Sequence, residues 1–557
     1  METTANLADY EGLSEVFEWE SIYADADWDA PDEINIAHEV CDRHAMKRGT
    51  VGLFFVGPNG ERERITFWEL AQRSNQFANV LDDLGLEQGD PVFAYMPRLP
   101  ERYVSLLGTL KAGNVFGGID EQYGPDRIAH RLNDSGASVV VTVPEHRETV
   151  EAALERVESV EHVVVVSDDG TGVRRGDISY YAEMETAAHE YGTAKTSGSD
   201  PALLYYTGGT TGRAKGVVHG HSWVVGIAAA QLYAGNLAQH QTDLYWGTGD
   251  LGWLTAPVNT LGVWFWGHSL FVYEGEFAPE RWIDLLEEFP ITVLHSVPTI
   301  YRQLRDHDEQ LADVDLDVHR ALSTGESLES DLVEWGQERL GVPIHDTYGQ
   351  AETGNMIINT YPSTETRSGS MGKPLPGVEA AVVDPDSGTR LGPNETGQIA
   401  VRDTFPSFFL GYWDDPDRTD EAFVDDWYLT GDLAQVDEDG YFWFQGRADD
   451  VIISGGSRIG PVPIERVLGE HDAVVESAAV PTSRPDRKRA VKAYVVPRES
   501  VEPCNDLADE IVAHAAETLS KRERPEAIEF CESLPKTETG DVRRSELRET
   551  SLRGGPE

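Results

Sequence analysis

The residues best suited to phosphate chemistry lie in a loop that reads YTGGTTGRAKG, residues 206–216. Glycines let backbone N–H groups turn into a concavity, and threonine hydroxyls add hydrogen-bond donors. Lys215 adds a positive charge. The common P-loop pattern GxxxxGK[ST] does not fit, because Lys215 lies three residues after Gly212. The loop predicts a phosphate cradle outside the kinase and GTPase class, and the alternative is a flexible surface turn.

Four further stretches follow the loop: STGESL (323–328), DTYGQAETG (346–354), YLTGD (428–432) and GRADDVIISGGSRIGPVPIE (446–465). Each alone reads as an ordinary turn or charged loop. Five stretches in this order, over nearly the whole chain, resemble the adenylate-forming enzymes. That superfamily comprises acyl-CoA synthetases, luciferases and the adenylation domains of peptide synthetases. The closest likeness is to acetyl- and medium-chain acyl-CoA synthetases, which are acid-thiol ligases that use ATP, Mg²⁺ and CoA.

The resemblance implies an ATP site. Tyr348 matches an aromatic residue that stacks on adenine, and Asp432 matches an acid that binds the ribose hydroxyls. Glu352 matches an acid that holds Mg²⁺, for which a carboxylate is a suitable hard ligand. Lys215 and Glu352 are thus the implied catalytic residues. The full ATP-binding set is Thr207, Gly208, Gly209, Thr210, Thr211, Gly212, Lys215, Gly325, Glu326, Ser327, Asp346, Thr347, Tyr348, Gly349, Gln350, Ala351, Asp432, Arg447 and Arg458.

The resemblance also implies a CoA site and a hinge. Asp449 matches the hinge between a large and a small domain, while Gly455, Gly456 and Ser457 match backbone that meets CoA. RPDRKRAVK, residues 484–492, is one of the densest basic runs in the chain. We expect Arg487 and its neighbours to meet CoA phosphates. A solvated charged turn is an equally good interpretation of that run.

The acyl pocket is predicted at Gly349 and Trp253. In acetyl-CoA synthetases a bulky Trp follows the adenine-stacking aromatic residue and shortens the pocket, whereas this chain has Gly349 there. Acids longer than acetate should therefore fit. The opposing possibility is that indoles of the aromatic segment 245–300 refill the space: Trp246, Trp253, Trp264 and Trp266. That segment suits a buried core or a cavity wall. His219 and His221 are interpreted as structural.

Residues 534–544, LPKTETGDVRR, contain one departure from the family pattern. The last family motif resembles PKTxxGK, and its final lysine reaches the acyl-phosphate centre. In this chain that position is Asp541. Three hypotheses follow: a slow enzyme in which Lys536 or Arg543 reaches in, a protein that performs only the thioester step on preformed acyl-AMP, or a non-catalytic nucleotide- or acyl-binding protein or inactivated variant. Because the other motifs match, we favour an acyl-CoA synthetase whose adenylation step is impaired.

The elements that position these motifs are those of an α/β protein. FWELAQRSNQFANVLDDLGL has apolar residues at helical spacing, whereas DPVFAYM, SVVVTV and VEHVVVVSDD read as short buried strands. Such alternation indicates parallel sheets buried on both faces. After about residue 378, turns separate short strands, which predicts a small β-rich subdomain. We expect an adenylation domain over residues 1–446 and a mobile α+β domain over residues 447–557.

Composition limits the partners. The chain has 557 residues and 98 Asp and Glu against 45 Lys and Arg, a net charge of −53. This charge disfavours binding to nucleic acid. It also makes the surface repel itself at low salt. Molar salt shortens the Debye length to about 3 Å and screens that repulsion, so the charge suggests a cytoplasm of very high salt, as in a halophile. Three scattered cysteines argue against disulfides and thiolate metal sites. No leader or membrane-spanning run is apparent, so we expect a cytoplasmic protein. The oligomeric state stays open.

Overall fold

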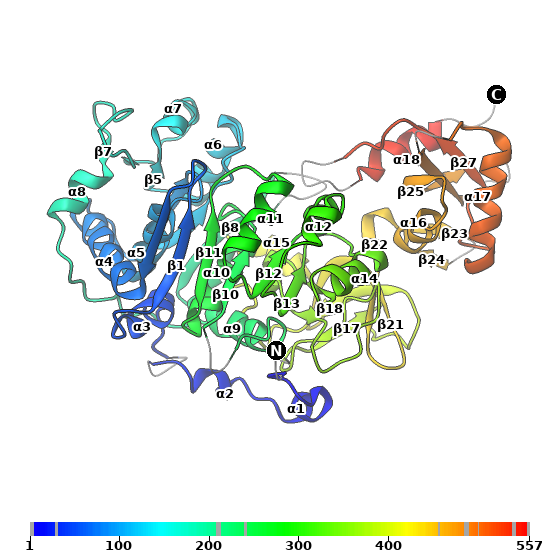
Figure 1. Ribbon diagram of the computed structural model, residues 1–557, viewed down its shortest axis with the longest axis horizontal. Coiled ribbons are helices and arrows are strands. Elements are labelled where there is room, and N and C mark those ends of the chain that lie inside the picture. The colour runs from blue at the N-terminus through cyan, green and yellow to red at the C-terminus, as the bar shows by residue number, and fades with distance from the viewer. Residues whose placement is uncertain are drawn as a thin grey trace. The chain divides into compact units, whose positions relative to one another are not determined.

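The computed structural model describes residues 5–27, 32–207, 213–238, 242–454, 457–483, 489–498, 501–536 and 542–553. The chain divides into two compact units. Figure 1 labels their helices and strands. Unit 1 consists of Met1–Thr366, Pro374–Val378 and Thr404–Glu421, and unit 2 of Arg367–Lys373, Glu379–Asp403 and Ala422–Glu557. The chain therefore enters unit 2 and returns to unit 1 before it ends. The predicted domain boundary at residues 446 and 447 stays a prediction.

The first sheet of unit 1 has the strand order β19-β9-β8-β4-β3-β5-β6-β7. Its central strands are parallel, with Val92 beside Val139 and Val139 beside His162. Every residue of β3, β4 and β5 is buried, as expected for a sheet covered on both faces. The strands are β3 (Pro91–Tyr95), β4 (Val115–Gly118), β5 (Val139–Thr142), β6 (His162–Val165), β7 (Ile178–Ser179), β8 (Pro201–Thr207), β9 (Lys215–Gly220) and β19 (Gly411–Tyr412).

The second sheet of unit 1 contains the order β15-β14-β13-β12-β10-β11-β1-β2. Strands β10 to β14 pair in parallel, so their carboxyl ends share one edge. The strands are β1 (Val51–Val56), β2 (Arg62–Thr66), β10 (Leu244–Gly247), β11 (Ser269–Tyr273), β12 (Val293–Ser296), β13 (Arg320–Ser323), β14 (Ile344–Tyr348) and β15 (Ile358–Asn359), and the two-residue β16 (Lys373–Pro374) straddles the division between the units.

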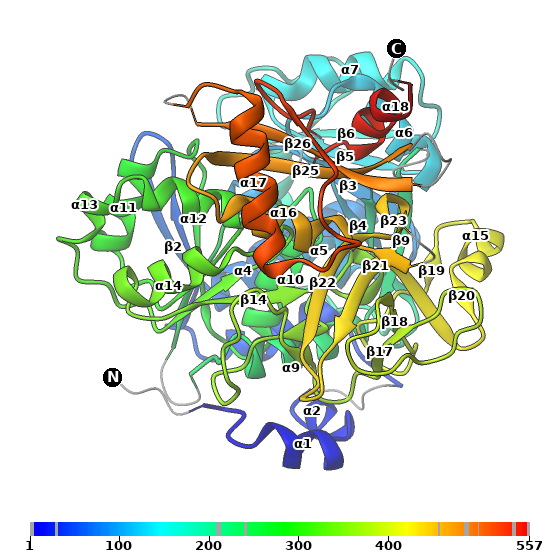
Figure 2. The same ribbon diagram turned by 90° about the vertical axis from the view of Figure 1, so that its right-hand side faces the viewer.

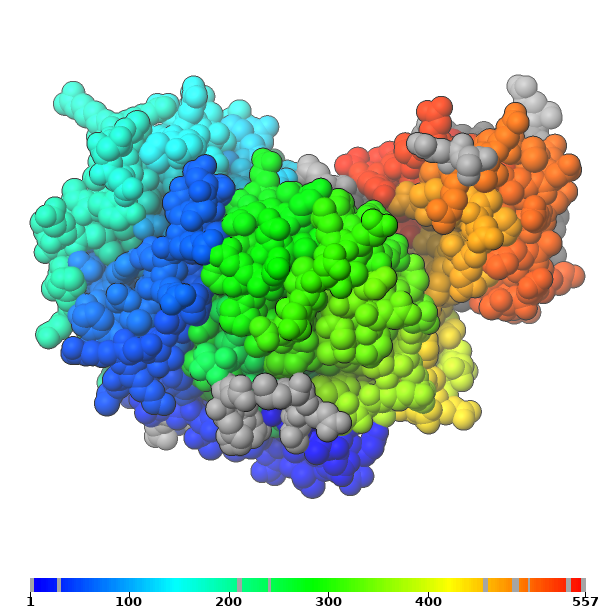
Figure 3. Space-filling view, in the orientation of Figure 1, coloured from blue at the N-terminus to red at the C-terminus, as the bar shows by residue number. Residues whose placement is uncertain are grey.

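Helices cover these sheets. Helix α4 (Phe67–Asp83) begins at a capping box in which Thr66 and Glu69 satisfy each other's backbone N–H groups. Helices α11, α12 and α14 lie across the second sheet and form much of the visible face of unit 1, near residues 280–340 (Figure 3). The remaining helices are α1 (Tyr10–Val16), α2 (Glu20–Tyr23), η1 (His38–Asp42), α3 (Arg43–Ala45), α5 (Pro100–Lys111), α6 (Pro125–Ser135), η2 (Pro144–His146), α7 (Arg147–Leu154), α8 (Tyr180–Thr186), α9 (Trp223–Tyr233), α10 (Thr255–Phe265), α11 (Pro279–Glu288), α12 (Pro298–Arg305), α13 (Asp308–Leu311), α14 (Ser330–Arg339), η3 (Ala351–Thr353) and α15 (Pro416–Glu421).

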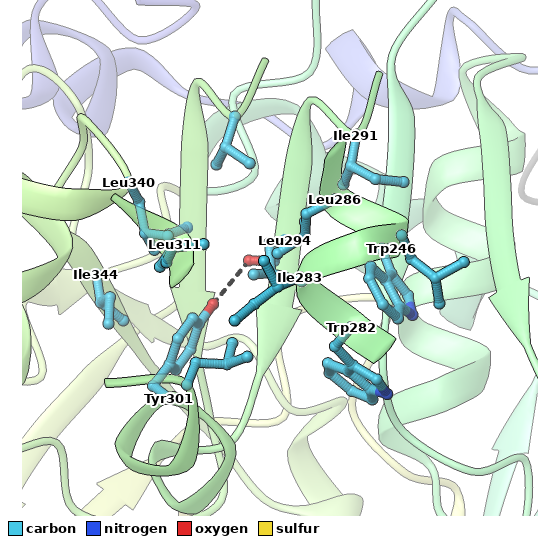
Figure 4. Packing of buried hydrophobic residues seen from close by; sticks show 14 of the residues in the cluster. Trp246, Trp282, Ile283, Leu286, Ile291, Leu294, Tyr301, Leu311, Leu340 and Ile344 are labelled. Atoms are coloured by element: carbon cyan, nitrogen blue, oxygen red, sulfur yellow. Dashed lines mark hydrogen bonds between the residues drawn. The ribbon is translucent and has the colours of Figure 1, made fainter. Parts of the chain in front are cut away.

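A large apolar core lies between the second sheet and these helices (Figure 4). Trp246 of β10 packs on Trp282 of α11, with ring centroids 4.5 Å apart. Tyr301 is fully buried, and its hydroxyl donates to the carbonyl of Leu294. The aromatic segment is thus partly core, since Trp246 and Trp264 are 1% and 0% exposed. Trp253, by contrast, is 36% exposed.

Unit 2 combines a β-rich part and an α+β part. The first is a sheet of order β17-β18-β21-β20 with β22 paired to β21, and the second contains β25-β26-β27. Alternate residues of β25 face opposite sides: Ala479 packs against α16 and α17, whereas Ala478 and Val480 pack against Leu547 of α18. Figure 2 shows α17 crossing in front of β25 and β26. The elements are β17 (Ala380–Val383), β18 (Gly397–Val401), β20 (Phe423–Val424), β21 (Trp427–Val436), β22 (Phe442–Arg447), η4 (Ala448–Asp450), β23 (Ile452–Ser454), β24 (Ser457–Ile459), α16 (Pro461–Gly469), β25 (Val474–Ser483), β26 (Arg489–Pro497), α17 (Asn505–Thr518), β27 (Ala527–Phe530) and α18 (Arg544–Arg553).

The predicted fold class is confirmed. The pieces expected to be strands are β3, β5 and β6, and the amphipathic stretch after Ile65 is α4. The turn-rich segment after residue 378 forms the short strands β17 and β18. Among the described residues, no helix has the length and apolar character that crossing a membrane requires.

Candidate functional site

The glycine-rich loop connects two antiparallel strands of the first sheet. Thr207, the last residue of β8, stands beside Lys215, the first residue of β9. Gly208, Gly209, Thr210, Thr211 and Gly212 lie outside the described residues. The Thr207 hydroxyl is buried and has no hydrogen-bond partner in the described part of the chain. The hairpin therefore brings a lysine and an available hydroxyl to the two ends of the predicted phosphate cradle.

Lys215 and Glu352 meet through a tyrosine that sequence analysis missed. The Lys215 Nζ donates to the Tyr412 hydroxyl at 2.9 Å, and that hydroxyl donates to Glu352 Oε1, also at 2.9 Å. Lys215 Nζ also lies 4.3 Å from the centroid of the Tyr412 ring. The direct distance from Lys215 Nζ to Glu352 Oε1 is 3.9 Å. Tyr412 thus bridges the two implied catalytic residues.

Backbone pairing explains why these three residues meet. Strand β19 pairs antiparallel with β9, which puts Tyr412 beside Val217. The carbonyl of Glu352 accepts from the N–H of Phe409, so η3 is attached to the segment that leads into β19. Glu352 is 6% exposed. No sequence signal marked Tyr412, because GYW at residues 411–413 reads as an ordinary aromatic turn.

Glu352 fits the Mg²⁺ role that the resemblance implies. Its carboxylate is a hard oxygen ligand, and one of its oxygens is oriented by Tyr412. Mg²⁺ in phosphoryl-transfer sites is usually held by one or two carboxylates together with substrate phosphates and waters. One buried carboxylate near a lysine is compatible with such a site.

The predicted adenine-site residues follow adjacent parallel strands. Ser323 of β13 pairs with Asp346 of β14, so the segments 324–329 and 349–355 leave the same edge of the sheet. Ligands of open α/β sheets bind outside the carboxyl ends of the strands. Gly325 has a φ of +87°, a left-handed conformation that favours glycine. Glu326 accepts from the Thr299 hydroxyl and from Arg302, at distances from 2.7 to 2.9 Å.

Other members of this set have structural contacts. The Thr347 hydroxyl donates to the carbonyl of Ser323 at 2.9 Å. Tyr348, Gly349, Gln350 and Ala351 are half-buried, whereas Gly325 and Ser327 are exposed. The structure thus brings residues 325–327 and 346–351 to one sheet edge within unit 1.

A cavity of about 200 Å³ lies in unit 1 and contains both residues predicted for the acyl pocket. A Cβ added to Gly349 would lie 2.3 Å from the backbone C and O of Asn355, so the folded loop 349–355 itself requires a glycine there. Trp253 supplies an exposed indole. The lining residues are Tyr205, Tyr206, Thr207, Gly252, Trp253, Leu254, Thr255, Gly349, Gln350, Ala351 and Asn355.

Two histidines, His219 and His221, lie at and just after the end of strand β9. His219 of β9 is fully buried, and burial lowers its pKa to about 3. His221 is also fully buried, and its Nδ1 accepts from the N–H of Ile36 at 3.1 Å. Burial lowers the pKa of His221 to about 3 as well. Both imidazoles are therefore neutral at pH 7.

Unit 2 contains the other predicted ATP-site residues. Arg447 Nη1 donates to Asp432 Oδ1 at 2.7 Å, across the pair β21 and β22. The carbonyl of the predicted hinge residue Asp449 accepts from Arg548 of α18 at 2.6 Å. The Asp450 carboxylate lies 3.6 Å from Arg544 and 3.4 Å from Arg548. Burial raises the pKa of Asp450, and the two arginines act against that shift.

The predicted CoA site is described only in part. Strand β24, which contains Ser457 and Arg458, pairs antiparallel with β23. Gly455, Gly456 and Arg487 lie outside the described residues. Asp541 also lies outside them. Beside it in the sequence, Lys536 Nζ is 2.5 Å from Glu476 Oε1, and Arg543 Nη1 is 3.1 Å from Glu546 Oε1.

Comparison with known proteins gives a consistent result over most of the chain. Residues 36–413 match the sequence model of the family described as AMP-binding enzyme, and residues 463–541 match that of its C-terminal domain. The chain is 36% identical to an acetyl-coenzyme A synthetase of Bacillus subtilis (strain 168) over 98% of this chain and 96% of the relative.

Solved structures of acyl-CoA synthetases and CoA ligases are also similar to this chain. The crystal structure of an acyl-CoA synthetase of Brucella canis has a TM-score of 0.77 and 33% identity, and the match covers 98% of this chain and 99% of the other. The anthranilate CoA ligase AuaEII in complex with anthranoyl-AMP has a TM-score of 0.83 and 27% identity, with coverage of 94% and 99%.

Proposed function

The chain belongs to the AMP-binding enzyme family and is an AMP-forming acyl-CoA synthetase, and from that premise we propose that it activates a short- to medium-chain carboxylic acid, with an adenylation step impaired by Asp541. The observation that carries the choice of acid is the cavity of about 200 Å³ beside Gly349. By the same measure a site for one water molecule needs only about 10–15 Å³, so this cavity is many times larger than a water site. A tail of several methylene groups is therefore accommodated.

The reaction consists of two half-reactions. A carboxylate oxygen of the acid bonds to the α-phosphorus of ATP, and the bond to pyrophosphate breaks. The CoA sulfur, as the thiolate, then bonds to the acyl carbon, and AMP leaves with the electron pair of the acyl–oxygen bond. Bound Mg²⁺ neutralises phosphate charge. Preorganised charges and donors at such a centre account for most of the catalysis.

We assign roles to this chain's residues on that basis. Lys215, the Thr207 hydroxyl and the glycine-rich loop bind phosphate, while Glu352 holds Mg²⁺ and Tyr412 orients Glu352. Support comes from the Tyr412 hydroxyl, which bridges Lys215 and Glu352. The other proposed ATP-binding residues of unit 1 are Gly325, Glu326, Ser327, Asp346, Thr347, Tyr348, Gly349, Gln350 and Ala351. Those of unit 2 are Asp432, Arg447 and Arg458. CoA binds Gly455, Gly456, Ser457 and Arg487, and the chain pivots at Asp449.

Asp541 supports the impairment of the first half-reaction. An acid stands where the family motif has a lysine that meets developing negative charge. Removal of one such stabilising contact typically costs about 2.7–4 kcal/mol. The two nearby cations already have acidic partners, because Lys536 pairs with Glu476 and Arg543 with Glu546. This favours impairment over replacement of the lysine by either residue.

A second candidate function follows from the same residue. The thioester step does not require the lysine, so the protein would accept preformed acyl-AMP and transfer the acyl group to CoA.

We propose the cytoplasm as the compartment of this protein, since its three cysteines are free thiols.

The test measures pyrophosphate release with ATP, Mg²⁺, CoA and a series of C2–C8 acids in high salt, for this chain and for Asp541→Lys. We expect the lysine variant to release pyrophosphate at least about 100-fold faster. Parallel assays supply acyl-AMP and CoA, for which both proteins should form acyl-CoA at similar rates. Equal pyrophosphate release by both proteins would contradict the impairment. Failure of both proteins in both assays would contradict the proposed substrate.

A further inference from the structure

Trp253 is a large aromatic residue that lines the cavity and yet is 36% exposed. An exposed indole has no close packing on all sides, so its position depends on specific contacts. The indole Nε1 donates to Asp120 Oδ2 at 2.5 Å. Tyr123 adds an edge-on contact, with ring centroids 6.3 Å apart. Asp120 itself is fixed, because its Oδ1 accepts from the N–H of Gln122 at 2.9 Å.

The backbone around Asp120 and Trp253 is built for close approach. A Cβ at Gly118 would lie 1.8 Å from the carbonyl O of Leu251, and a Cβ at Gly252 would lie 2.3 Å from the N of Asp120. Two glycines thus let the segment after β4 contact the segment after β10. These segments belong to different sheets of unit 1.

A buried arginine fastens the same two segments. Arg102 of α5 is 0% exposed. Its guanidinium donates to the carbonyl of Ile119 at 2.9 Å and to both carboxylate oxygens of Asp250 at 3.0 and 3.1 Å. The Asp250 carboxylate in turn accepts from the N–H of Gly252 at 2.7 Å. These hydrogen bonds join the two backbone segments next to Trp253, and the bond from the indole to Asp120 orients the side chain.

The lining residues also define the chemistry of the occupant. They are aromatic, aliphatic, amide, hydroxyl and glycine residues, and none of the described lining residues carries a charge. A second carboxylate on the tail would be buried without a cation, which is strongly unfavourable.

From these observations we propose that Asp120 is a specificity-positioning residue: its hydrogen bond holds the Trp253 indole as one wall of a pocket for uncharged acyl tails and so sets the tail length that binds best. This inference rests on the proposed function, because it takes the cavity to be the acyl pocket. It predicts an effect that grows with tail length, since a longer tail buries more apolar surface against that wall.

The experiment avoids the adenylation step. It measures by calorimetry the Kd of acyl-sulfamoyl adenosines, in which a sulfamoyl group replaces the phosphate of acyl-AMP, with C2, C4, C6 and C8 tails. For the unchanged chain we expect Kd to fall about fourfold per buried methylene group until the pocket is full. A C6 tail that ends in a carboxylate should bind about 100-fold more weakly than hexanoyl.

Asp120→Asn keeps the size and one acceptor for Gln122 but cannot accept at both positions. We expect it to leave the Kd of the acetyl analogue unchanged and to weaken hexanoyl binding about three- to tenfold. Trp253→Phe removes the donor, so adding Asp120→Asn to it should have no further effect. The matched control is Asp308→Asn, which alters another Trp–Asp hydrogen bond of unit 1, from Trp335 at 3.0 Å, away from the cavity. This control should leave every Kd unchanged.

The outcomes separate the inference from its premise. If Trp253→Phe alters the tail-length profile and Asp120→Asn does not, the role of Asp120 is overturned and the acyl pocket stands. An equal weakening for all tails, or an equal effect in the Trp253→Phe background, also overturns it. If no analogue binds the unchanged chain, or if neither tail length nor Trp253 matters, the proposed site fails together with the inference.

Discussion

Replacing Tyr412 with Phe tests the bridge between Lys215 and Glu352. The change removes one hydroxyl and keeps the ring, so the contact of the Lys215 ammonium with the ring at 4.3 Å is retained. The hydroxyl bonds two charged groups, each at 2.9 Å. Hydrogen bonds to charged groups contribute about 1.5–3 kcal/mol. At about 1.4 kcal/mol per factor of ten, the loss corresponds to about 10- to 150-fold weaker Mg²⁺–ATP binding.

A second effect acts in the same direction. Without the bridging oxygen, Lys215 Nζ is free to close from 3.9 Å to a direct ion pair with Glu352 at about 2.8 Å. At an effective dielectric of about 20, that closure strengthens their attraction by about 1.7 kcal/mol. The direct pair would withdraw Lys215 from the proposed phosphate contacts and Glu352 from the proposed metal contact. Both consequences weaken binding of the Mg²⁺–ATP complex.

The assay is a calorimetric titration of ATP at several Mg²⁺ concentrations, because the predicted defect concerns metal-dependent binding. Tyr301→Phe is the matched control, since it removes a buried tyrosine hydroxyl that lies within hydrogen-bond distance of the backbone carbonyls of Leu294 and Leu322. The control should lower thermal stability and leave the Mg²⁺ dependence unchanged. If Tyr412→Phe binds Mg²⁺–ATP as tightly as the unchanged chain, or if both variants behave alike, the bridge has no role in positioning Glu352.

Three further predictions concern stability. Burial lowers the His219 pKa to about 3, so below pH 6.5 the unfolded chain binds a proton that the folded chain does not; stability is then lost as pH falls, by about 2 kcal/mol at pH 5. His219→Gln should reduce the loss between pH 7 and pH 5 by that amount in urea unfolding, and an unchanged loss would refute a buried neutral imidazole. Gly349→Ala forces a Cβ against the Asn355 backbone and should destabilise the chain by about 1–3 kcal/mol in the same assay, whereas a neutral result would mean that the loop 349–355 relaxes freely. With a net charge of −53, the midpoint of thermal unfolding should rise between 0.1 M and 3 M KCl, and a midpoint that stays constant would count against adaptation to high salt.

Local sequence patterns predicted the elements well because their causes are local. The capping box at Thr66 and the buried valines of β5 form where their own residue types require. The residues that were missed are fixed by distant contacts. Tyr412 is 197 positions from Lys215, and Asp120 is 133 positions from Trp253. No periodicity or motif spacing encodes such a meeting.

The role of Gly349 also could not be predicted in full from the sequence. Sequence analysis interpreted it as added pocket volume. The structure adds a packing reason, since the backbone of Asn355 occupies the space of a Cβ. The return of residues 404–421 to unit 1 is likewise invisible in the sequence, because a β-strand of two residues has no distinctive pattern.

The late return of β19 to unit 1 has a consequence for synthesis on the ribosome. Tyr412 is made 60 positions after Glu352, and the segments 367–373 and 379–403 between them belong to unit 2. At a synthesis rate of about 5–20 residues per second, Tyr412 is added to the nascent chain about 3–12 s after Glu352. Until then η3 also lacks the Phe409 N–H that it bonds in the finished protein. A fragment cut between residues 366 and 412 would keep the glycine-rich loop but lack the tyrosine that joins Lys215 to Glu352.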